Sequence, residues 1–322
     1  MKAIQVPAPG GPEAMKLVDL PTPKPGPKQA LVRLAAIGVN FIDVYFRTGL
    51  YKSDLPIALG NEGAGTVEAI GPEVSEVAVG DRVVYSMHRG SYADYAVVPA
   101  ALLAKIPAKV DFTSAAACLL QGMTAHYLTH STFPLEAGQA CLVHAASGGT
   151  GALIVQMAKM RGARVFGTVS TEEKARIARE AGADEVILYT RQEFAPEVKR
   201  LTGDRGVDVV YDSVGQATFD QSLDSLRPRG LLALFGQSSG PVPPFNPNIL
   251  NGKGSLFLTR PTLGHYIAAR DEFLWRSGDV LGWVAAGKLK LRIAGTYPLA
   301  QAADAHRALE GRQTAGKLLL LT

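Results

Sequence analysis

Residues 140–151 read ACLVHAASGGTG, an apolar run followed by a cluster of small residues that contains three glycines. The apolar run predicts a buried strand, and residues 149–160 follow a helical pattern. A dinucleotide-binding turn needs small residues between such a strand and helix, because the backbone turns tightly and approaches a pyrophosphate. The N–H groups that open the helix then face the phosphates. The stretch therefore predicts a dinucleotide site, with a purely structural turn as the alternative, although Ala146 replaces the usual first glycine.

Strand and helix patterns alternate along the middle of the chain. Strands are expected at 140–144, 164–169, 185–189, 207–212 and 230–235, and helices at 113–129, 149–160 and 171–181. Alternating strands and helices fold into a parallel, doubly wound sheet. We therefore expect a doubly wound α/β domain here.

The first third of the chain and its last segment follow different patterns. Short strands are expected at 1–6, 16–19, 30–37, 63–70, 82–85, 92–98 and 102–105, with Pro-Gly and Gly-Pro pairs as turn signals. This spacing is typical of an antiparallel, barrel-like domain. After Arg260 we expect a long helix over 265–286, a strand near 293–297, a helix near 300–311 and a last strand at 317–321. These last elements can return to the first domain.

Length and composition limit the class of protein. The chain has 322 residues, more than one hydrophobic core usually supports, so two domains are expected. Its 47% hydrophobic and 19% charged residues argue against a disordered chain. The net charge of +4 is not gathered into a basic stretch interleaved with aromatics. We therefore expect no nucleic-acid partner, and the excess charge can serve a phosphate-rich cofactor.

The two cysteines, Cys118 and Cys141, stand in apolar surroundings. They exclude a disulfide framework and a multi-cysteine metal site. The first residues lack the apolar core of a signal peptide, and no uninterrupted apolar run is long enough to span a bilayer. A cytoplasmic protein without a membrane partner is expected.

The end of the strand predicted at 164–169 bears on the choice between NAD and NADP. NAD enzymes usually place a carboxylate there to hold the ribose 2′-hydroxyl, and no acid stands directly after Val169. Lys174 follows one helical turn later and can pair with a 2′-phosphate. Glu172 and Glu173 leave NAD open as an alternative, but the pattern favours NADP.

Five segments carry a resemblance to a known family. They are HAASGGTG at 144–151, IGVNFID at 37–43, GDRV at 80–83, YDSVG at 211–215 and LTRP at 258–261. These segments resemble the quinone reductases related to zeta-crystallin, a zinc-free branch of the medium-chain dehydrogenase/reductase superfamily, and the similarity runs from Met1 to Thr322. The resemblance implies an α/β fold in which a GroES-like β-barrel catalytic domain, 1–123 and 262–322, carries an inserted doubly wound Rossmann domain, 124–261. It also implies a homodimer and an NADPH site in the cleft between the domains.

The same resemblance implies which residues contact cofactor and substrate. Phosphate and ribose contacts fall on Ser170, Lys174, Tyr189 and Arg312. Contacts near the pyrophosphate and nicotinamide fall on Asn40, Asp43, Tyr45, Thr124, Gly148, Gly149, Thr150, Phe235, Gly236, Ser238 and Ser239. Catalytic orientation of substrate or nicotinamide is expected from Asn40, Tyr45 and Tyr51, and substrate contacts from Arg260 and Gln121. Related reductases often have lysine at the position of Gln121. The missing positive charge puts the affinity for cofactor or substrate in doubt, but not the family.

The positions that hold catalytic zinc in related alcohol dehydrogenases are matched by Asn40, Asn61 and Gln121. Neutral amides are poor zinc ligands beside thiolate and imidazole, and the four-cysteine structural lobe is absent from the sequence. His126 and His130 are spaced to share one helix face, but no third ligand is nearby in sequence. We therefore expect chemistry that does not depend on a metal.

The metal-free site bears on the substrate. An unactivated ketone is hard to polarise without a metal, whereas a quinone accepts hydride readily and needs little acid catalysis. Residues 40–51 are expected to form an aromatic-rich loop whose flat rings suit a planar quinone, unless these rings only pack the core. We predict an NADPH-dependent quinone reductase. Two alternatives stay open: a 2-alkenal or enoyl-thioester reductase with Tyr51 as proton donor, and an NADPH-binding protein with a structural or nucleic-acid role.

An apolar strand candidate at 255–259 bears on the oligomeric state. It lies late in the cofactor domain, where it can form a sheet edge. An exposed apolar edge strand invites pairing with a second copy, so a homodimer is expected from this segment as well.

Overall fold

Two units make up the part of the chain that the structure, a computed structural model, describes: residues 1–311 and 314–322. One unit comprises Met1–Met123 and Tyr266–Thr322, and the other comprises Thr124–His265. Each unit encloses a hydrophobic core of its own.

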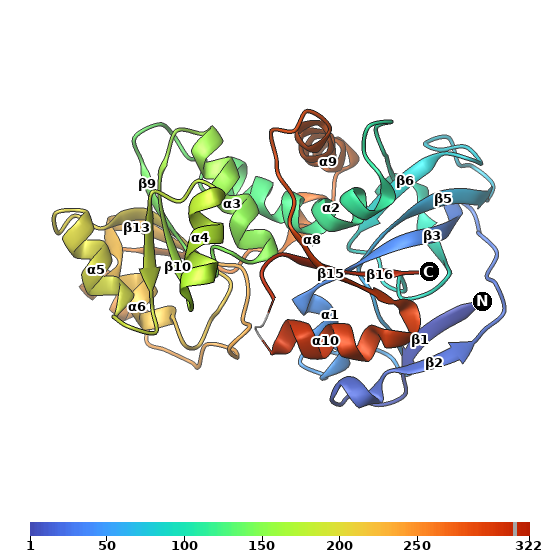
Figure 1. Ribbon diagram of the computed structural model, residues 1–322, viewed down its shortest axis with the longest axis horizontal. Helices are drawn as coiled ribbons and strands as arrows, with labels where there is room; N and C mark the ends of the chain where they lie inside the picture. The colour runs from blue at the N-terminus through green and yellow to red at the C-terminus, as the bar shows by residue number, and fades with distance from the viewer. Residues whose placement is uncertain (312–313) are drawn as a thin grey trace. The chain divides into compact units, whose positions relative to one another are not determined.

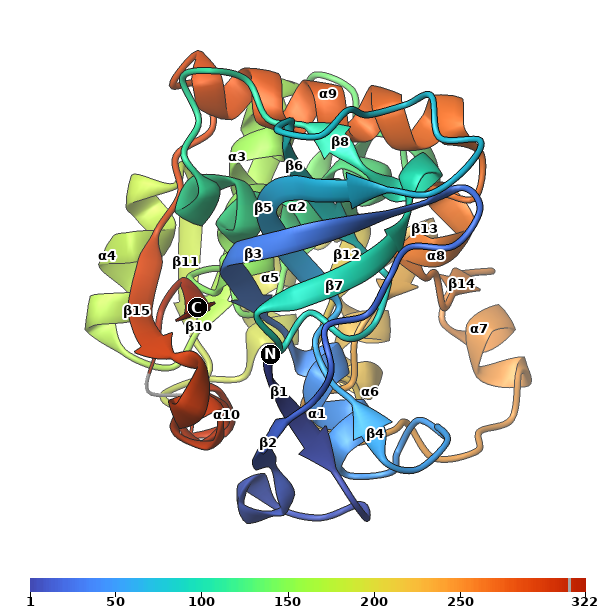
Figure 2. The same ribbon diagram turned by 90° about the vertical axis from the view of Figure 1, so that its right-hand side faces the viewer.

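The first unit is built around a seven-stranded, mostly antiparallel sheet. Its strands run in the order β15-β16-β3-β5-β6-β8. Strand β7 pairs with β3 and lies beside it in Figure 2. The strands are β3 (Gln29–Val39), β5 (Glu62–Ile70), β6 (Arg82–Ser86), β7 (Tyr95–Pro99), β8 (Ala104–Lys105), β15 (Ile293–Pro298) and β16 (Lys317–Leu321). A smaller sheet in the order β2-β1-β4 contains β1 (Lys2–Val6), β2 (Lys16–Asp19) and β4 (Ile57–Ala58). Because β16 pairs with β3, the last strand lies beside Gly38 and Val39.

Helix α1 (Phe41–Arg47) occupies the segment expected to be a loop, so the prediction of a loop over 40–51 is wrong for its first half. The Asp43 carboxylate accepts a 2.9 Å hydrogen bond from the backbone N–H of Asn40, the residue before the helix. A carboxylate in this place satisfies an otherwise unpaired N–H and interacts favourably with the helix dipole. The helix therefore begins directly after the buried end of β3.

The long helix expected over 265–286 is divided into α8 (Leu263–Tyr266) and α9 (Arg270–Ala285). The buried guanidinium of Arg276 donates a 2.9 Å hydrogen bond from Nε to the carbonyl oxygen of Tyr266. In a continuous helix that carbonyl would accept from the N–H four residues later, so the bond to Arg276 favours a break. Helix α2 (Phe112–Tyr127) begins in this unit, and its last residues, from Thr124 on, belong to the second unit. The remaining helix and 3₁₀ turns of this unit are α10 (Ala302–Glu310), η1 (Pro12–Ala14), η2 (Ala100–Leu102) and η4 (Leu299–Gln301).

The second unit is a six-stranded parallel sheet with packed helices, which confirms the predicted doubly wound class. Its strands are β9 (Ala140–Val143), β10 (Arg164–Val169), β11 (Glu185–Leu188), β12 (Val207–Asp212), β13 (Leu226–Leu234) and β14 (Phe257–Thr259). Its helices are α3 (Gly149–Met160), α4 (Glu172–Glu180), α5 (Phe194–Leu201), α6 (Phe219–Asp224), α7 (Asn248–Gly252) and the π-helical turn η3 (Leu128–Thr132). Figure 1 shows α3 and α4 against β10, and α5 beside α6.

The strands follow the order β11-β10-β9-β12-β13-β14. From β9 the chain adds successive strands on one side, up to β11, and then crosses to the other side of β9 to form β12, so the point of reversal lies between β9 and β12. Loops that follow the two strands at such a reversal diverge, which leaves room for a ligand at their carboxyl ends. Val143 and Asp212 end these two strands. Strand β14 forms one edge of the sheet, as predicted, and Phe257 on it is 60% exposed.

Candidate functional site

The glycine-rich turn lies between β9 and α3, and its backbone requires small residues. A Cβ atom on Gly151 would lie 2.2 Å from the carbonyl oxygen of Ala145. A Cβ atom on Gly167 of β10 would lie 2.7 Å from the Cβ of Ala146, so Gly167 makes the room that Ala146 needs in place of a glycine. No side chain of the described residues caps α3 at Gly148. The first N–H groups of the helix are therefore suited to a phosphate.

Of the residues predicted to hold the adenosine phosphate and ribose, Ser170 directly follows β10 and Tyr189 directly follows β11, and Lys174 lies in the first turn of α4. The backbone N–H of Tyr189 donates a 3.2 Å hydrogen bond to the carbonyl of Val169, which keeps the two strand ends together. Tyr189 is 45% exposed, so a ligand can reach its ring. The fourth predicted residue, Arg312, lies outside the described residues.

Two polar contacts shape the start of α4, near this predicted phosphate site. Nη1 of Arg191 donates a 2.6 Å hydrogen bond to Oε1 of Glu172, one of the two acids that left NAD open. This pairing reduces the repulsion that the carboxylate would exert on a 2′-phosphate. The hydroxyl of Thr171 accepts from the N–H of Lys174 at 3.2 Å and so caps the helix.

The loop after β13 contains the predicted nicotinamide contacts Phe235, Gly236, Ser238 and Ser239. Its backbone is bonded to the turn after β12, since the N–H of Phe235 donates to the carbonyl of Asp212 at 2.8 Å. The Ser239 hydroxyl donates to the carbonyl of Val214 at 2.7 Å and accepts from the N–H of Ala217 at 3.0 Å. The hydroxyl of Ser239 therefore holds this loop in position.

Asn40 lies in a buried polar cluster of the first unit. Its Oδ1 accepts a 2.7 Å hydrogen bond from Nζ of Lys317. Its Nδ2 donates to Oε2 of Glu62 at 3.0 Å and to the carbonyl of Gly38 at 3.2 Å. Lys317 also pairs directly with Glu62, with Nζ 2.6 Å from Oε2. Both amide hydrogens of Asn40 are thus used within the protein, which fixes the amide orientation next to α1.

Asp43 is fully buried in the same cluster and accepts three hydrogen bonds. They come from the N–H of Asn40 at 2.9 Å, Nδ2 of Asn61 at 2.7 Å and the hydroxyl of Tyr92 at 3.3 Å. Burial raises the pKa of Asp43 to about 6, and these donors and Lys317 oppose the rise. Asp43 therefore holds the backbone of Asn40 and the side chain of Asn61 in place. We call Asn40, Asp43, Asn61, Glu62 and Lys317 the Asn40 network.

A second set of charged residues reaches the Asn40 network through Tyr92. The Arg47 guanidinium donates to Nδ1 of His306 at 2.9 Å and to the carboxylate of Glu310 at 2.8 Å. Because a guanidinium only donates, Nδ1 of His306 accepts, and its proton is on Nε2, 2.9 Å from the Tyr92 hydroxyl. Burial lowers the pKa of His306 to about 3, so the ring is neutral. This arrangement leaves the Tyr92 proton to Asp43.

Tyr45, Phe46 and Tyr51 form an aromatic group on and after α1. The ring centroid of Tyr51 lies 5.2 Å from that of Tyr45 and 5.6 Å from that of Phe46, both edge-on. The N–H of Tyr51 donates to the carbonyl of Tyr45 at 3.0 Å, which folds the segment back on the helix. Phe46 packs against the core of the unit, so the packing alternative holds for this residue. Tyr45 and Tyr51 are half-buried.

The other predicted contacts lie in both units. Oε1 of Gln121, on α2, is buried and lacks a hydrogen-bond partner among the described residues. An unpaired buried acceptor is unfavourable, so this oxygen is suited to a donor on a ligand. Thr124, also on α2, is buried. Arg260 follows β14 and is exposed, and its Nη1 donates to the carbonyl of Pro261 at 3.4 Å.

The positions matched to zinc ligands carry amides, and two of them are bonded to acids. Asn40 and Asn61 donate to Glu62 and Asp43 respectively. The rings of the two histidines of α2 and η3, at positions 126 and 130, stack at 4.3 Å. Within residues 1–311 and 314–322, no three His, Cys, Asp or Glu side chains gather as a metal-binding group. Metal independence stays a prediction.

Sequence reasoning did not identify Glu62 and Lys317. Each is a single charge at the start of a strand that is otherwise apolar in its first residues, β5 and β16. A charge within a buried strand needs a buried partner, and that was the available signal. It does not tell which of the many acids of the chain the lysine meets.

Comparison with known proteins gives the family of this chain. Residues 26–108 match the alcohol dehydrogenase GroES-like domain, and residues 149–271 match the zinc-binding dehydrogenase family. A quinone oxidoreductase from Pseudomonas aeruginosa is 45% identical over 322 residues, which cover 99% of each chain. The chain belongs to the quinone oxidoreductase family of the medium-chain dehydrogenases/reductases. The predicted GroES-like and Rossmann folds of its parts are thereby confirmed.

Two further proteins are similar to this chain over nearly its whole length. A 2-haloacrylate reductase from a Burkholderia species is 44% identical over 97% of this chain and 96% of its own. The solved structure of the Escherichia coli quinone oxidoreductase complexed with NADPH is 42% identical, with a TM-score of 0.98 and 100% of both chains covered. Among the described residues, no helix is both long and apolar enough to cross a membrane.

Proposed function

We propose that the protein is an NADPH-dependent quinone oxidoreductase. The observation that carries the proposal is similarity over the full chain to quinone oxidoreductases, one of them solved with NADPH. The geometry supports it, because the glycine-rich turn opens α3 with N–H groups suited to a pyrophosphate.

The described residues fit this cofactor. Gly148, Gly149 and Thr150 would hold the pyrophosphate at the start of α3. Ser170, Lys174 and Tyr189 would hold the 2′-phosphate, where a lysine forms a charge-assisted contact. When bound, NADPH supplies the hydride that reduces the substrate.

The protein's own contribution near the substrate is orientation. We propose that Tyr45 and Tyr51 offer aromatic faces and hydroxyls to a planar quinone. Asn40, held by Lys317 and Glu62, keeps one orientation beside them. A reduced quinone can take its protons from water, so neither tyrosine needs to be an acid.

An alternative chemistry is reduction of an activated carbon–carbon double bond, and the similarity to a 2-haloacrylate reductase supports it as the second candidate. Steady-state oxidation of NADPH against quinones, 2-haloacrylate, enals and ketones separates the candidates. A quinone reductase should keep nearly full turnover in Tyr51→Phe. An enoyl-type reductase that uses Tyr51 as its acid should lose roughly 10²–10⁴ in rate. Tyr95→Phe, a half-buried tyrosine on β7, is the matched control.

Cofactor choice has its own test. NADPH should bind more tightly than NADH, and Lys174→Ala should narrow the difference by about tenfold or more, since a charge-assisted contact to phosphate is lost. Arg176→Ala, on the same helix but paired with Glu180, is the control. Equal dissociation constants for NADPH and NADH in the wild-type protein would refute the preference, and tight NADPH binding without any turnover would favour a non-enzymatic role.

Three further properties belong to the proposal. Activity should survive exhaustive chelation, with no stoichiometric zinc in elemental analysis.

The protein should form a homodimer through the edge strand β14, where Phe257 is 60% exposed. Sedimentation should then give twice the 34.0 kDa of one chain. A cytoplasmic location suits its two buried free cysteines and can be checked by cell fractionation.

A further inference from the structure

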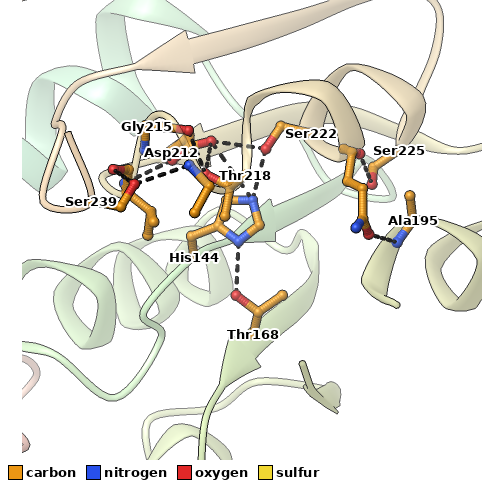
Figure 3. Close-up of polar contacts among 12 residues, drawn as sticks. His144, Thr168, Ala195, Asp212, Gly215, Thr218, Ser222, Ser225 and Ser239 are labelled. Carbon is orange, nitrogen blue, oxygen red and sulfur yellow. Dashed lines mark hydrogen bonds and ion pairs between the residues drawn. The ribbon is translucent and has the colours of Figure 1, made fainter. Parts of the chain in front are cut away.

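A buried histidine in the second unit joins three elements of the fold (Figure 3). Nδ1 of His144 lies 2.8 Å from Oγ1 of Thr168 on β10, and Nε2 lies 2.9 Å from Oγ of Ser222 on α6. The Ser222 hydroxyl donates a 2.8 Å hydrogen bond to Oδ2 of Asp212, the last residue of β12. None of these four side chains is more than 2% exposed. We call His144, Thr168, Ser222 and Asp212 the His144 network.

The hydrogen bonds of the His144 network run in one direction. Ser222 gives its only hydroxyl hydrogen to Asp212, so it accepts from Nε2–H of His144. Burial lowers the pKa of His144, so the ring is neutral. Its Nδ1 therefore accepts from the hydroxyl of Thr168. Each member has a defined role, and removal of one leaves a buried partner without a hydrogen bond.

Asp212 extends this order to the turn after β12. Its Oδ1 accepts from the N–H of Val214 at 2.7 Å and from that of Gly215 at 3.0 Å. Gly215 has a φ of +89°, and a Cβ there would lie 2.8 Å from the carbonyl oxygen of Gly240. The turn therefore packs directly on the loop after β13. Ser239 of that loop bonds back to Val214.

His144 directly precedes the glycine-rich turn after β9. His144 is thus part of the segment that leads into α3. Through hydrogen bonds by way of Ser222 and Asp212 it is also connected to the turn that supports the loop after β13. The proposed cofactor has to contact both segments, with its pyrophosphate at the first and its nicotinamide at the second.

We propose that His144 is a positioning residue for NADPH: through Ser222 and Asp212 it sets the spacing between the glycine-rich turn and the loop after β13. The inference rests on the proposed cofactor. Packing alone does not explain the histidine. Its ring lies edge-on to Phe194 with centroids 4.8 Å apart, a contact that an apolar ring also makes. Only a ring with a donor and an acceptor on opposite sides meets the hydroxyls of both Thr168 and Ser222.

The test compares two ligands on proteins that lack one hydroxyl each, Ser222→Ala and Thr168→Val. NADPH spans both segments, whereas adenosine 2′,5′-bisphosphate lacks the nicotinamide half. Calorimetric titration gives Kd for each ligand. NADPH affinity should fall about tenfold to a hundredfold in each variant, because a buried group loses its partner, while bisphosphate affinity stays within about twofold.

Matched variants separate this effect from general damage. Ser225, at the end of α6, is equally buried, but its hydroxyl donates to the carbonyl of Gln221 at 2.8 Å, outside the His144 network. Ser225→Ala should therefore leave NADPH affinity unchanged. Thr168→Ser keeps the hydroxyl and should recover the affinity that Thr168→Val loses. Thermal melting shows which variants are folded.

Wild-type NADPH affinity in folded Ser222→Ala and Thr168→Val proteins would overturn the proposal. Equal weakening of both ligands would overturn it as well, because it indicates loosening of the whole unit. If Thr168→Val does not fold, Ser222→Ala against Ser225→Ala decides. A wild-type protein that binds NADH but not NADPH refutes the proposed cofactor, and the same comparison is then made with NADH and adenosine monophosphate. A wild-type protein that binds neither refutes both.

Discussion

The Asn40 network of the first unit and the His144 network of the second are both buried, yet they differ in charge. The first contains a direct ion pair, with Nζ of Lys317 2.6 Å from Oε2 of Glu62. The second contains one carboxylate, Asp212, whose partners are hydroxyls and backbone N–H groups, and a neutral imidazole. Both lie next to segments for which we propose ligand contacts.

The difference concerns what each network can hold in place. Lys317 and Glu62 are 255 positions apart in the chain, so their pair holds the last strand against β3 and β5. Removal of one charge would leave the other buried and unpaired, which is strongly unfavourable. The His144 network instead fixes the direction of hydrogen bonds between neighbouring strand ends. An ionic network should thus matter most for stability, and a neutral one for local geometry.

The largest expected effect is on the ion pair. Lys317→Met should lower the free energy of unfolding by about 3–5 kcal/mol, because Glu62 stays buried without its counter-charge. Urea unfolding at neutral pH measures this loss. Adding Glu62→Gln to Lys317→Met removes the stranded charge and should recover most of it.

A surface pair gives the control for that comparison. Arg176 and Glu180 form an ion pair with side chains more than half exposed. Arg176→Met should lower the free energy of unfolding by less than about 1 kcal/mol. If Lys317→Met is no more destabilising than Arg176→Met, the buried pair does not hold the last strand against β3 and β5.

The neutral network should give a smaller loss. Thr168→Val leaves Nδ1 of His144 without a donor, which should lower the free energy of unfolding by about 1–3 kcal/mol. Thr168→Ser should lose less than Thr168→Val in the same urea titration. A loss in Thr168→Val as large as that in Lys317→Met would remove the distinction between the ionic and the neutral network.

Sequence patterns predicted the elements of the second unit better than the polar contacts within them. The helix at 149–160 and the strands at 164–169 and 207–212 were predicted with the bounds that the structure has. These are apolar runs of strand or helix periodicity with small or polar residues beside them, and such local patterns suffice. Helix α1 was missed because its start depends on one contact, from Asn40 to Asp43, within a segment rich in aromatics.

Contacts between distant residues have no local pattern. His144 was part of a quoted motif, but its partners Thr168 and Ser222 come from elements 24 and 78 positions away. Only the order of the parallel strands, with β9 between β10 and β12, brings them together. The same holds for Lys317 and Glu62 across the antiparallel sheet. Residue type and motif thus predicted where a ligand would bind, whereas the groups that orient the proposed site required the fold.

The next effect, on pH dependence, concerns the histidine next to the Asn40 network. The pKa of His306 is about 3 in the folded protein, against an ordinary value of 6.5. Below pH 6.5 the unfolded chain binds a proton there that the folded protein does not, so stability falls as pH falls. At pH 5.5 this contribution is about 1.4 kcal/mol. Between pH 7.5 and pH 5.5 the free energy of unfolding should therefore fall by about 1.4 kcal/mol less in His306→Gln than in the wild type, as measured by unfolding titrations at the two pH values.

Asp43 contributes with the opposite sign. Its pKa is raised from 3.8 to about 6, so the folded protein binds the extra proton and gains stability as pH falls toward 3.8. Asp43 is present in both proteins and therefore largely cancels in the difference. His265→Gln, at an exposed position, controls for the substitution itself. An identical pH dependence in wild type and His306→Gln would show that His306 is not held neutral.

The smallest expected effect is at the exposed pair of Arg191 and Glu172, which extends the comparison to a surface pair near the proposed phosphate site. Exposed ion pairs contribute little to stability, and both side chains are at least 60% exposed. Arg191→Gln should leave the free energy of unfolding within about 1 kcal/mol of wild type. It should still weaken NADPH binding by about twofold to fivefold, because Glu172 loses its counter-charge and then repels the 2′-phosphate. NADH lacks that phosphate, so its Kd should change less, and Glu172→Gln should shift NADPH affinity the other way. Calorimetric titration of both cofactors at low and high salt measures these shifts, which should shrink as salt screens exposed charges. Equal changes for NADPH and NADH would mean that this pair shapes the start of α4 without acting on the phosphate.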